Sequence, residues 1–288
     1  MTDLVVRRLL VDMEAPIPRH WCGDDPFRSA FFNALSMSFP VGEQFFIDSV
    51  RNAFKALPAE KQAQFDAEVK GFVGQEATHR RLHGLYNAHL ETLGLPNAWE
   101  PRAKARIRRL EGLNPRHAVA ATAANEHFTA IFATWLLHNP EVLASTDERL
   151  STLWLWHASE EAEHRCTAFD LYQALGGNEK WRLRWFRLVT FFFLTDALRQ
   201  TITNLRADGT LWRRATWASA WRHLFGKQGL IRQTFGPWRD YFKPGFHPSH
   251  HDASASLRWL EDNRSRYQPV GQPGVQAPAS APLQPAAA

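Results

Sequence analysis

The stretch FVGQEATHRRLH, residues 72–83, places Glu76 three positions before His79 in a segment whose apolar residues recur at helical spacing. Residues three apart lie on the same side of a helix, so both side chains can reach one point. The same Glu-x-x-His spacing returns at Glu161 and His164, within HASEEAEHRC, residues 157–166. Because a chain with this many Glu and His contains roughly one such pair by chance, the surroundings of the two copies must decide their meaning.

Four long helices are predicted around these motifs from apolar periodicity and from the proline and glycine residues at their ends. They cover residues 29–57, residues 59 to the stop at Gly94 and Pro96, residues 115–138, and residues 145 to the stop at 176–177. Pro40 is expected either to kink the first helix or to begin a new one. This region shows neither an alternation of β-branched residues nor a hairpin-turn sequence, so no β-strands are predicted in it. The sequence therefore predicts an all-α fold built on a four-helix bundle.

The two helices without a Glu-x-x-His pair each carry a glutamate among apolar residues, Glu43 in FPVGEQFFI and Glu126 in AATAANEHFTAIF. Burying a carboxylate in such surroundings is costly unless it is paired, protonated or bound to a cation. Two divalent ions would neutralise the glutamates of all four helices without leaving an unpaired charge. The candidate metal ligands are therefore Glu43, Glu76, His79, Glu126, Glu161 and His164.

One Glu from each of two helices, with Glu-x-x-His from each of the other two, is the ligand set of ferritin-like di-iron and di-manganese carboxylate proteins. The glutamate of each pair is predicted to bridge two divalent ions and its histidine to bind one of them. Glu43 and Glu126 would be terminal ligands. Carboxylate and imidazole ligands suit iron, which is the expected metal, or manganese. The link of about twenty residues between the second and third helices is long enough to cross the bundle.

Four segments of the chain resemble the bacterial family of predicted metal-dependent hydrolases. They are FNALSMSFPVGEQFFI (residues 32–47), FVGQEATHRRLH, ANEHFTA (residues 124–130) and the HASEEAEHR block. The similarity extends from about Val5 to the FHPSHH stretch near residue 250. It implies a ferritin-like, all-helical fold, and a metal site formed by the same six residues.

Other polar residues near the motifs are expected outside the ligand set. His83 and His157 each lie one helical turn from a motif and are interpreted as hydrogen-bonding neighbours of the ligands. Glu160 is interpreted as a weaker substitute ligand. Glu163 points away from Glu161 around the helix, so we expect it to be solvated or paired with an arginine of the basic second half.

The chain divides into three predicted parts. Residues 1–178 form the metal-binding bundle, residues 179–266 a basic, Trp-rich helical extension packed on it, and residues 267–288 a disordered tail rich in Pro and Ala. Two or three helices are expected between Trp181 and about Gly226. The cluster His247, His250 and His251 near its end is interpreted as a flexible loop, with a second metal site as the alternative.

Charge is distributed unevenly between the two halves. Residues 1–179 carry 18 Lys and Arg against 23 Asp and Glu, whereas residues 180–268 carry 16 against 6. The basic half could meet a nucleic acid, an anionic membrane surface or the acidic half of its own chain. Tryptophan at helical spacing is more typical of a core, a substrate entrance, a homodimer contact or a membrane-surface face than of nucleic-acid binding, so no nucleic acid is expected.

Cysteine usage and the start of the chain point to the cytoplasm. Cys22 and Cys166 provide neither a disulfide framework nor a CxxC metal site. Arg7 and Arg8 interrupt the first apolar run, which does not fit a signal peptide. The most apolar window, residues 188–198, is too short for a membrane span. We therefore expect a cytoplasmic protein for which a peripheral membrane contact remains open.

Several functions are compatible with a dinuclear metal centre. The first interpretation is an enzyme with a carboxylate-bridged di-iron centre that oxidises a small, hydrophobic molecule with dioxygen. The alternative is a hydrolase in which a metal-bound water of lowered pKa attacks the substrate. A non-enzymatic iron-binding protein and a purely structural bundle are further alternatives. No catalytic residue beyond the ligands is assigned.

Overall fold

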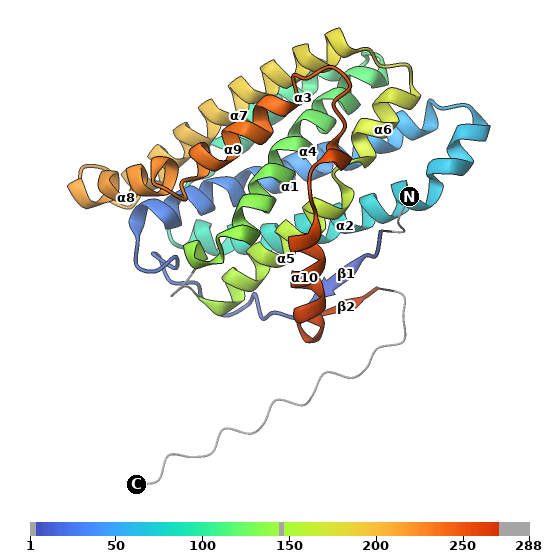
Figure 1. The fold of residues 1–288 in the computed structure, drawn as a ribbon. Coiled ribbons are helices and arrows are strands. Elements are labelled where there is room, and N and C mark those ends of the chain that lie inside the picture. The colour runs from blue at the N-terminus through green and yellow to red at the C-terminus, as the bar shows by residue number, and fades with distance from the viewer. Residues whose placement is uncertain (1–3, 144–146, 271–288) are drawn as a thin grey trace.

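Four helices form the central bundle of the computed structural model, which describes residues 4–143 and 147–270 (Figure 1). They are α1 (Pro26–Lys55), α2 (Ala59–Thr92), α4 (Pro115–His138) and α5 (Glu148–His164). Helix α1 packs along α2 and α4 along α5, while α1 also contacts α4 and α2 contacts α5. The predicted all-α bundle is confirmed.

The bundle helices begin where the sequence supplies capping side chains. Asp25, Asn114 and Asp147 each accept a hydrogen bond from a backbone N–H in the first turn of α1, α4 and α5, respectively. This satisfies a donor that has no partner within the helix. Residues 145–146, where the fourth helix was predicted to begin, lie outside the described residues.

Helix α1 runs without a break through Pro40, so no new helix begins there. Proline has no N–H to donate to the carbonyl four residues earlier, which belongs to Ser36. The side-chain amide of Asn87 on α2 donates to that carbonyl at 3.0 Å instead. The contact between α1 and α2 thus replaces the hydrogen bond that proline removes.

The predicted fourth helix is wrong in one respect, because it ends at His164 and a separate helix, α6 (Thr167–Ala174), follows. The guanidinium of Arg165 donates to the carbonyl of Ala162, which would otherwise accept the N–H of Cys166 in a continuous helix. Arg165 also donates to the carbonyls of Pro248 and His251. Its contacts with a distant segment could not be predicted from local periodicity.

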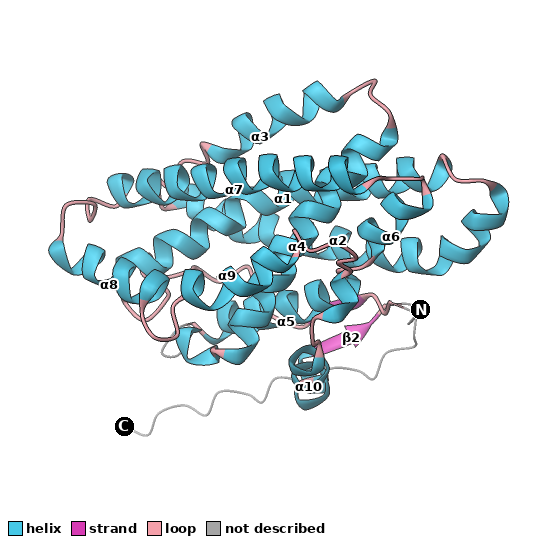
Figure 2. Cartoon of the chain, turned by 45° about the horizontal axis from the view of Figure 1, so that its top comes forward, coloured by secondary structure: helices cyan, strands magenta, loops and turns pink. Residues whose placement is uncertain are grey.

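Further helices pack around the bundle (Figure 2). The link between α2 and α4 contains α3 (Trp99–Ile107) and a 3₁₀ turn, Arg108–Leu110. Helix α7 (Glu179–Ala207) lies across α1 and α4, α8 (Arg214–Phe225) contacts α1, α9 (Leu230–Asp240) contacts α4, and α10 (Ser254–Asp262) contacts α5. Shorter 3₁₀ turns are Pro140–Leu143, Pro248–His250 and Arg264–Arg266.

A two-stranded antiparallel ribbon, which the sequence did not suggest, joins the two ends of the described chain. Strand β1 (Arg7–Leu9) pairs with β2 (Tyr267–Pro269). The predicted tail therefore begins too early, because residues 267–269 gain a strand partner and the Tyr267 hydroxyl donates to the carbonyl of Leu260. The rest of the predicted tail, residues 271–288, lies outside the described residues.

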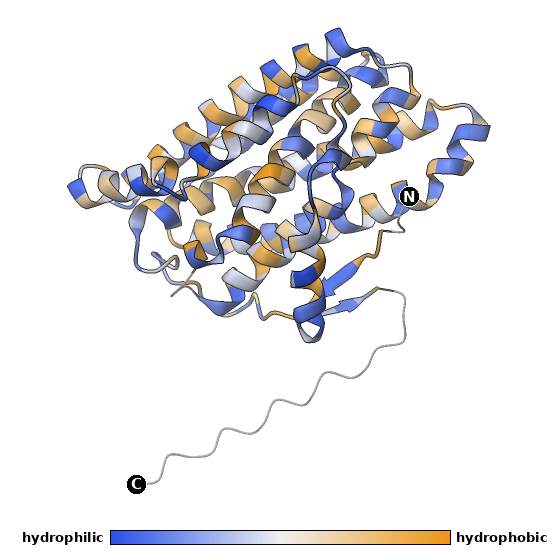
Figure 3. Cartoon of the chain, viewed as in Figure 1, coloured by the Kyte–Doolittle hydropathy of each residue, from blue (hydrophilic) through white to orange (hydrophobic). Residues whose placement is uncertain are grey.

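Buried apolar residues gather in three clusters, and the two larger ones lie along the bundle. One cluster contains Phe32, Leu82 and Trp154, and the other contains Val50 and Phe72. Figure 3 shows apolar positions distributed through the central helices. Within residues 4–143 and 147–270, no helix combines the length and the apolar character needed to cross a membrane.

Candidate metal centre

Four helices deliver the predicted ligands to one buried layer. Helix α1 supplies Glu43, α2 supplies Glu76 and His79, α4 supplies Glu126, and α5 supplies the second Glu-x-x-His pair. All six side chains belong to residues that are at most 5% exposed. The structure therefore places every predicted ligand in the interior, where an uncompensated charge is costly.

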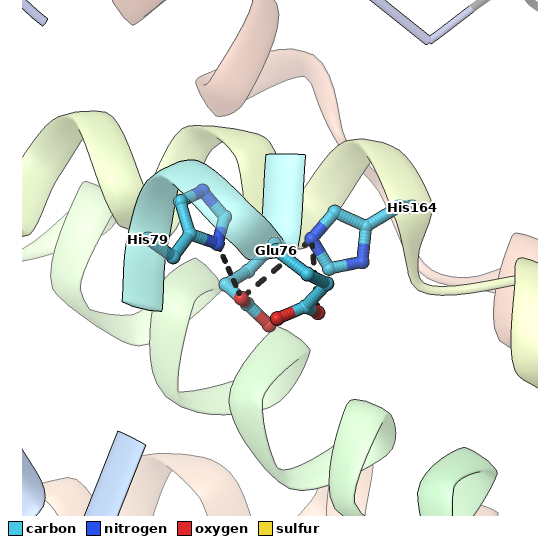
Figure 4. Close-up of side chains that lie close together, drawn as sticks. Glu76, His79 and His164 are labelled. Carbon is cyan, nitrogen blue, oxygen red and sulfur yellow. Dashed lines mark ion pairs between the residues drawn. The ribbon is translucent and has the colours of Figure 1, made fainter. Parts of the chain in front are cut away.

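Both Glu-x-x-His pairs converge on one point. Ligand atoms of Glu76, His79, Glu161 and His164 all lie within 4.8 Å of one another. Oε1 of Glu161 is 3.5 Å from Nδ1 of His79 and 3.6 Å from Nε2 of His164. Figure 4 shows Glu76, His79 and His164 pointing toward one another from α2 and α5. This grouping is compatible with chelation of a cation by the two motifs together.

A second grouping beside the first contains Glu43, His83 and His157, whose ligand atoms also lie within 4.8 Å of one another. His83 and His157 were interpreted as outer neighbours, yet the structure places them as close to Glu43 as ligands of one ion would be. Their positions four residues after His79 and four before Glu161 were the signal for this role.

The hydrogen bonds of the second grouping have a defined direction. The Ser36 hydroxyl donates to Asn87, so His83 Nδ1 donates to Ser36 and His83 Nε2 accepts from His157 Nδ1 at 2.7 Å. His157 Nε2 then presents a lone pair to Oε1 of Glu161, 2.8 Å away. Two acceptors at this distance need a cation or a second proton between them. The direction of the chain therefore favours a cation near His157.

Glu126 contacts His164, one of the two histidines of the first grouping. Oε2 of Glu126 is 2.9 Å from Nδ1 of His164. This contact orients the ring so that Nε2 of His164 faces Glu76 and Glu161, at 3.8 and 3.6 Å. The other oxygen of Glu126 has no hydrogen-bond partner. Glu126 can thus orient His164, as carboxylates do for metal-bound imidazoles, while keeping one oxygen for a cation.

Unpartnered atoms in the centre provide the test of whether metal ions fit. Buried ligand atoms without a hydrogen-bond partner are both carboxylate oxygens of Glu43 and Glu76, Oε1 of Glu126, Oε2 of Glu161, Nδ1 of His79 and Nε2 of His164. Each would cost roughly 1–3 kcal/mol if left unsatisfied. These atoms can offer lone pairs to a cation, and they come from all six predicted ligands. Divalent cations therefore fit the donor set.

The carboxylates and imidazoles have perturbed pKa values in the absence of a cation. Burial, followed by the charges of neighbouring glutamates, raises the pKa of Glu76 well above its usual range. Burial also raises the pKa of Glu126 to about 7, although the charge of His164 opposes this. Burial alone would lower the pKa of His79, but hydrogen bonds to Glu160 and Glu161 outweigh it and raise the pKa to about 10. The pocket thus retains protons where cations could replace them.

An arginine from the N-terminal strand supports His79 through a carboxylate. Oε2 of Glu160 is 2.9 Å from Nε2 of His79, and Oε1 of Glu160 accepts from Arg7 at 3.0 Å. Arg7 also makes two hydrogen bonds to Glu163, at 2.7 and 3.0 Å. Glu160 therefore acts as a partner of His79, and Glu163 pairs with an arginine of the first strand, not of the basic half.

Close packing of α2 against the N-terminal segment allows this contact. A side chain at Gly74 would collide with Val6, and one at Gly71 with Leu4. Glycine at both positions lets the strand lie directly on the helix, which brings Arg7 to Glu160. A charged residue within the apolar run VVRRLL was the available sequence signal.

Arg7→Ala is expected to lower metal affinity by about 10- to 100-fold, the usual effect of removing an outer partner of a ligand. The substitution leaves Glu160 and Glu163 without their shared cation, so Glu160 should hold His79 less firmly. Isothermal titration with Mn²⁺ measures the change. Arg8→Ala, which alters the exposed neighbour on the same strand, is the matched control. Equal affinities for the two variants would contradict a role for Arg7 in positioning His79.

A small apolar cavity adjoins the centre. His157 and Glu161 line it together with aliphatic and aromatic residues of α1, α4, α5 and α7, which are Leu35, Phe39, Phe128, Phe132, Ala133, Trp154, Ala158 and Phe193. Its volume of about 20 Å³ is enough for roughly one water molecule. A larger molecule would therefore have to displace aromatic side chains to reach Glu161.

The three histidines after α9 do not assemble as a second metal site. His247 pairs with Asp170 at 2.7 Å, whereas His251 lies 3.6 Å from Asp240. Among the described residues, the groupings that could hold a metal do not include these histidines or His250. The centre in the bundle is thus the place where the described chain gathers metal ligands.

Comparison with known proteins agrees with the chemistry of this centre. The model of the family described as predicted metal-dependent hydrolase matches residues 5–252. No curated protein and no solved structure matches the chain. The family match covers most of the 288 residues and includes all six predicted ligands. The chain therefore belongs to the predicted metal-dependent hydrolase family.

Proposed function

We propose that the protein is a hydrolase that uses two divalent metal ions in the bundle to cleave a small, apolar substrate. The observation that carries this proposal is the convergence of unpartnered carboxylate oxygens and imidazole nitrogens from four helices beside an apolar cavity. Membership of a predicted metal-dependent hydrolase family favours hydrolysis over other reactions of such a centre. Oxygen-dependent oxidation, the first interpretation of the sequence, receives no corresponding support.

Each ion would have its own group of residues. Glu76, His79, Glu161 and His164 would hold one, and Glu43, His83 and His157 would hold the other, with Glu161 close to both groups. When bound, such ions supply Lewis acidity that acidifies water and polarises a substrate oxygen. This assignment differs from the ferritin-like pattern expected from the sequence, in which Glu43 and Glu126 are terminal ligands and His83 and His157 lie outside.

The surroundings of the centre indicate what kind of substrate would bind. Phe39 and Trp154 form part of the cavity wall and are in edge contact with the ring of His83. An apolar wall favours an apolar substrate group and excludes bulk water from the ligands. On α7, Phe193 lines the cavity, while Phe191 and Leu194 beside it are 62% and 53% exposed. The outer surface near α7 is thus suited to meet an apolar molecule before it enters.

The experiment that tests the proposal follows the source of the oxygen atom in the product. Protein loaded with Mn²⁺, Zn²⁺ or Fe²⁺ is supplied with aryl esters of different acyl length in water enriched in ¹⁸O. We expect turnover without dioxygen and ¹⁸O in the released acid. Incorporation from ¹⁸O₂ instead, with no reaction under anaerobic conditions, would overturn hydrolysis in favour of oxidation.

Size-exclusion chromatography distinguishes an enzyme from an iron-storage protein. Storage requires a closed shell of many subunits, whereas the enzyme is expected as a monomer or homodimer. A particle of about two dozen chains that mineralises iron would contradict the proposed activity.

A further inference from the structure

Helix α8 and the residues on either side of it form an exposed surface of aromatic and basic side chains, here called the α8 face. Its aromatic members are Trp212, Trp217, Trp221 and Phe225, and its basic members are Arg213, Arg214, Arg222 and Lys227. Trp212 is 88% exposed and Trp221 is 67% exposed. Side chains of this size are among the most costly to leave in water, so their exposure requires an explanation.

The two sides of helix α8 differ in exposure. One side packs on the protein, and the other belongs to the α8 face. Thr216, Ser219, Ala220 and His223 are buried and fall on one side of the helix. Trp217, Trp221 and Phe225, spaced four apart, fall on the other side, and the rings of Trp221 and Phe225 lie 4.9 Å apart. The exposed aromatic residues therefore form a row on the outer side of α8.

The α8 face carries a positive charge that the protein itself does not neutralise. Residues 209–239 contain six arginine and lysine residues and no acidic residue. Within the described parts of the chain, none of these six forms an ion pair. Of the alternatives left open by the sequence, pairing with the acidic first half thus does not account for the cations of this face.

The position of the α8 face suits contact with an extended surface. Helix α8 lies at one end of the long helices, and α6 lies toward the other end, in both views of the chain (Figures 1 and 2). A second copy of the chain docking symmetrically would place arginine against arginine, which is unfavourable. The α8 face combines cations with apolar rings. It therefore suits a partner that has negative charge at its surface and an apolar interior.

We propose that the α8 face docks the protein on the surface of an anionic lipid bilayer. Arginine and lysine would attract the anionic headgroups, each stabilising the bound state while the membrane lies within a Debye length. Trp212, Trp217 and Trp221 would enter the headgroup layer, where the amphipathic indole ring is most favourable. The proposed contact is peripheral.

Sedimentation with vesicles tests this proposal on the full-length protein. Vesicles of phosphatidylcholine with 30% phosphatidylglycerol are compared with pure phosphatidylcholine at low and high salt. We expect at least tenfold stronger binding to the anionic vesicles, and a loss of most of that binding at 0.5 M NaCl. Equal binding to the two vesicle types, or no binding at low salt, would overturn the proposal.

Paired variants locate the binding surface. Trp212→Gln with Trp221→Gln, and separately Arg214→Glu with Arg222→Glu, should each lower vesicle binding about tenfold or more. Leu113→Gln and Arg51→Glu change exposed residues elsewhere and should leave binding unchanged. Because all substituted side chains are exposed, circular dichroism should show unchanged folding. Conversion of a dimer to a monomer by the tryptophan variant, or tighter binding to a single-stranded oligonucleotide than to vesicles, would assign the face to a different partner.

Discussion

Glu76→Gln is expected to have opposite effects on the metal-free and the metal-loaded protein. Burial and three neighbouring carboxylates raise the pKa of Glu76 well above its usual range, so without metal the native state must hold a proton or tolerate repulsion. Glutamine has nearly the same volume as glutamate and carries no charge. It therefore needs no extra proton and is not repelled by the neighbouring carboxylates. We expect it to increase the free energy of unfolding of the metal-free protein at pH 8, with a smaller gain at pH 5.

The metal-loaded form should respond in the opposite direction. A neutral amide oxygen is a weaker ligand than a carboxylate, so we expect the metal content of Glu76→Gln to fall to less than half of that of the wild type. Wild-type protein at a thousandfold excess of metal over Kd should gain roughly 4 kcal/mol, or about 10 °C in Tm, and the variant should lose most of that gain.

Thermal unfolding with and without Mn²⁺ measures both effects. Glu91→Gln makes the same change at an exposed position of α2 and should leave metal content and both stabilities unchanged. If Glu76→Gln lowered the stability of the metal-free protein and left metal binding intact, Glu76 would be a structural residue and the account of the centre would fail.

Raising the pH from 6.5 to 10 should destabilise the metal-free protein. Burial favours a lower pKa for His79, but hydrogen bonds to Glu160 and Glu161 prevail and raise it from 6.5 to about 10. The native state therefore keeps a proton that the unfolded chain releases above pH 6.5. The stabilisation is complete below pH 6.5 and is lost as the pH rises through 10. At about 1.4 kcal/mol per pKa unit, His79 alone corresponds to roughly 5 kcal/mol.

The other titrating groups determine which pH window is informative. The pKa of His164 is also raised, with burial opposing and the charges of Glu126 and Glu161 prevailing, so it adds to the loss above pH 6.5. Burial lowers the pKa of His157 to about 4 and that of His223 to about 4, and these groups favour folding as the pH rises toward 6.5. Below pH 6.5 the effect of these two histidines opposes that of the buried carboxylates Glu76 and Glu126, whose pKa values are raised, whereas above pH 6.5 the groups with raised pKa all lower stability together.

Urea unfolding between pH 6.5 and 10, with a chelator and with saturating Mn²⁺, tests this prediction. Metal ions release the protons of their ligands, so the loaded protein should show little change over the window. His79→Gln should reduce the slope of the metal-free protein, and the part that remains should come from buried carboxylates such as Glu76 and Glu126, whose pKa values are also raised. His138→Gln changes an exposed histidine of α4 and should retain the slope. A metal-free protein whose stability stays level or rises from pH 6.5 to 10 would contradict the proposed coupling.

Most of the bundle could be predicted because its signals are local. Helical spacing, Pro115 in a first turn and Asp147 as a cap each act within a few residues, and the structure follows them. Departures occur where distant residues supply hydrogen bonds. The guanidinium of Arg165 ends α5 by contacts with residues near 248–251, and Asn87 allows α1 to continue past Pro40. Neither contact has a signature in the neighbouring sequence.

The candidate centre shows the same division between local and distant information. The three-residue spacing of Glu76 and His79 identified one helix face, and the structure buries that face as expected. The spacing could not reveal that His83 and His157 meet Glu43, since this depends on how α1, α2 and α5 are rotated against one another. Arg7 was missed because β1 reaches the centre only after pairing with β2, about 260 residues away.

Crystallography of metal-soaked protein with anomalous scattering at the metal edge tests the central claim most directly. The account predicts two anomalous peaks per chain inside the bundle, one among Glu76, His79, Glu161 and His164 and the other among Glu43, His83 and His157. Absence of both peaks, or a peak found only beside His247 or His251, would contradict it.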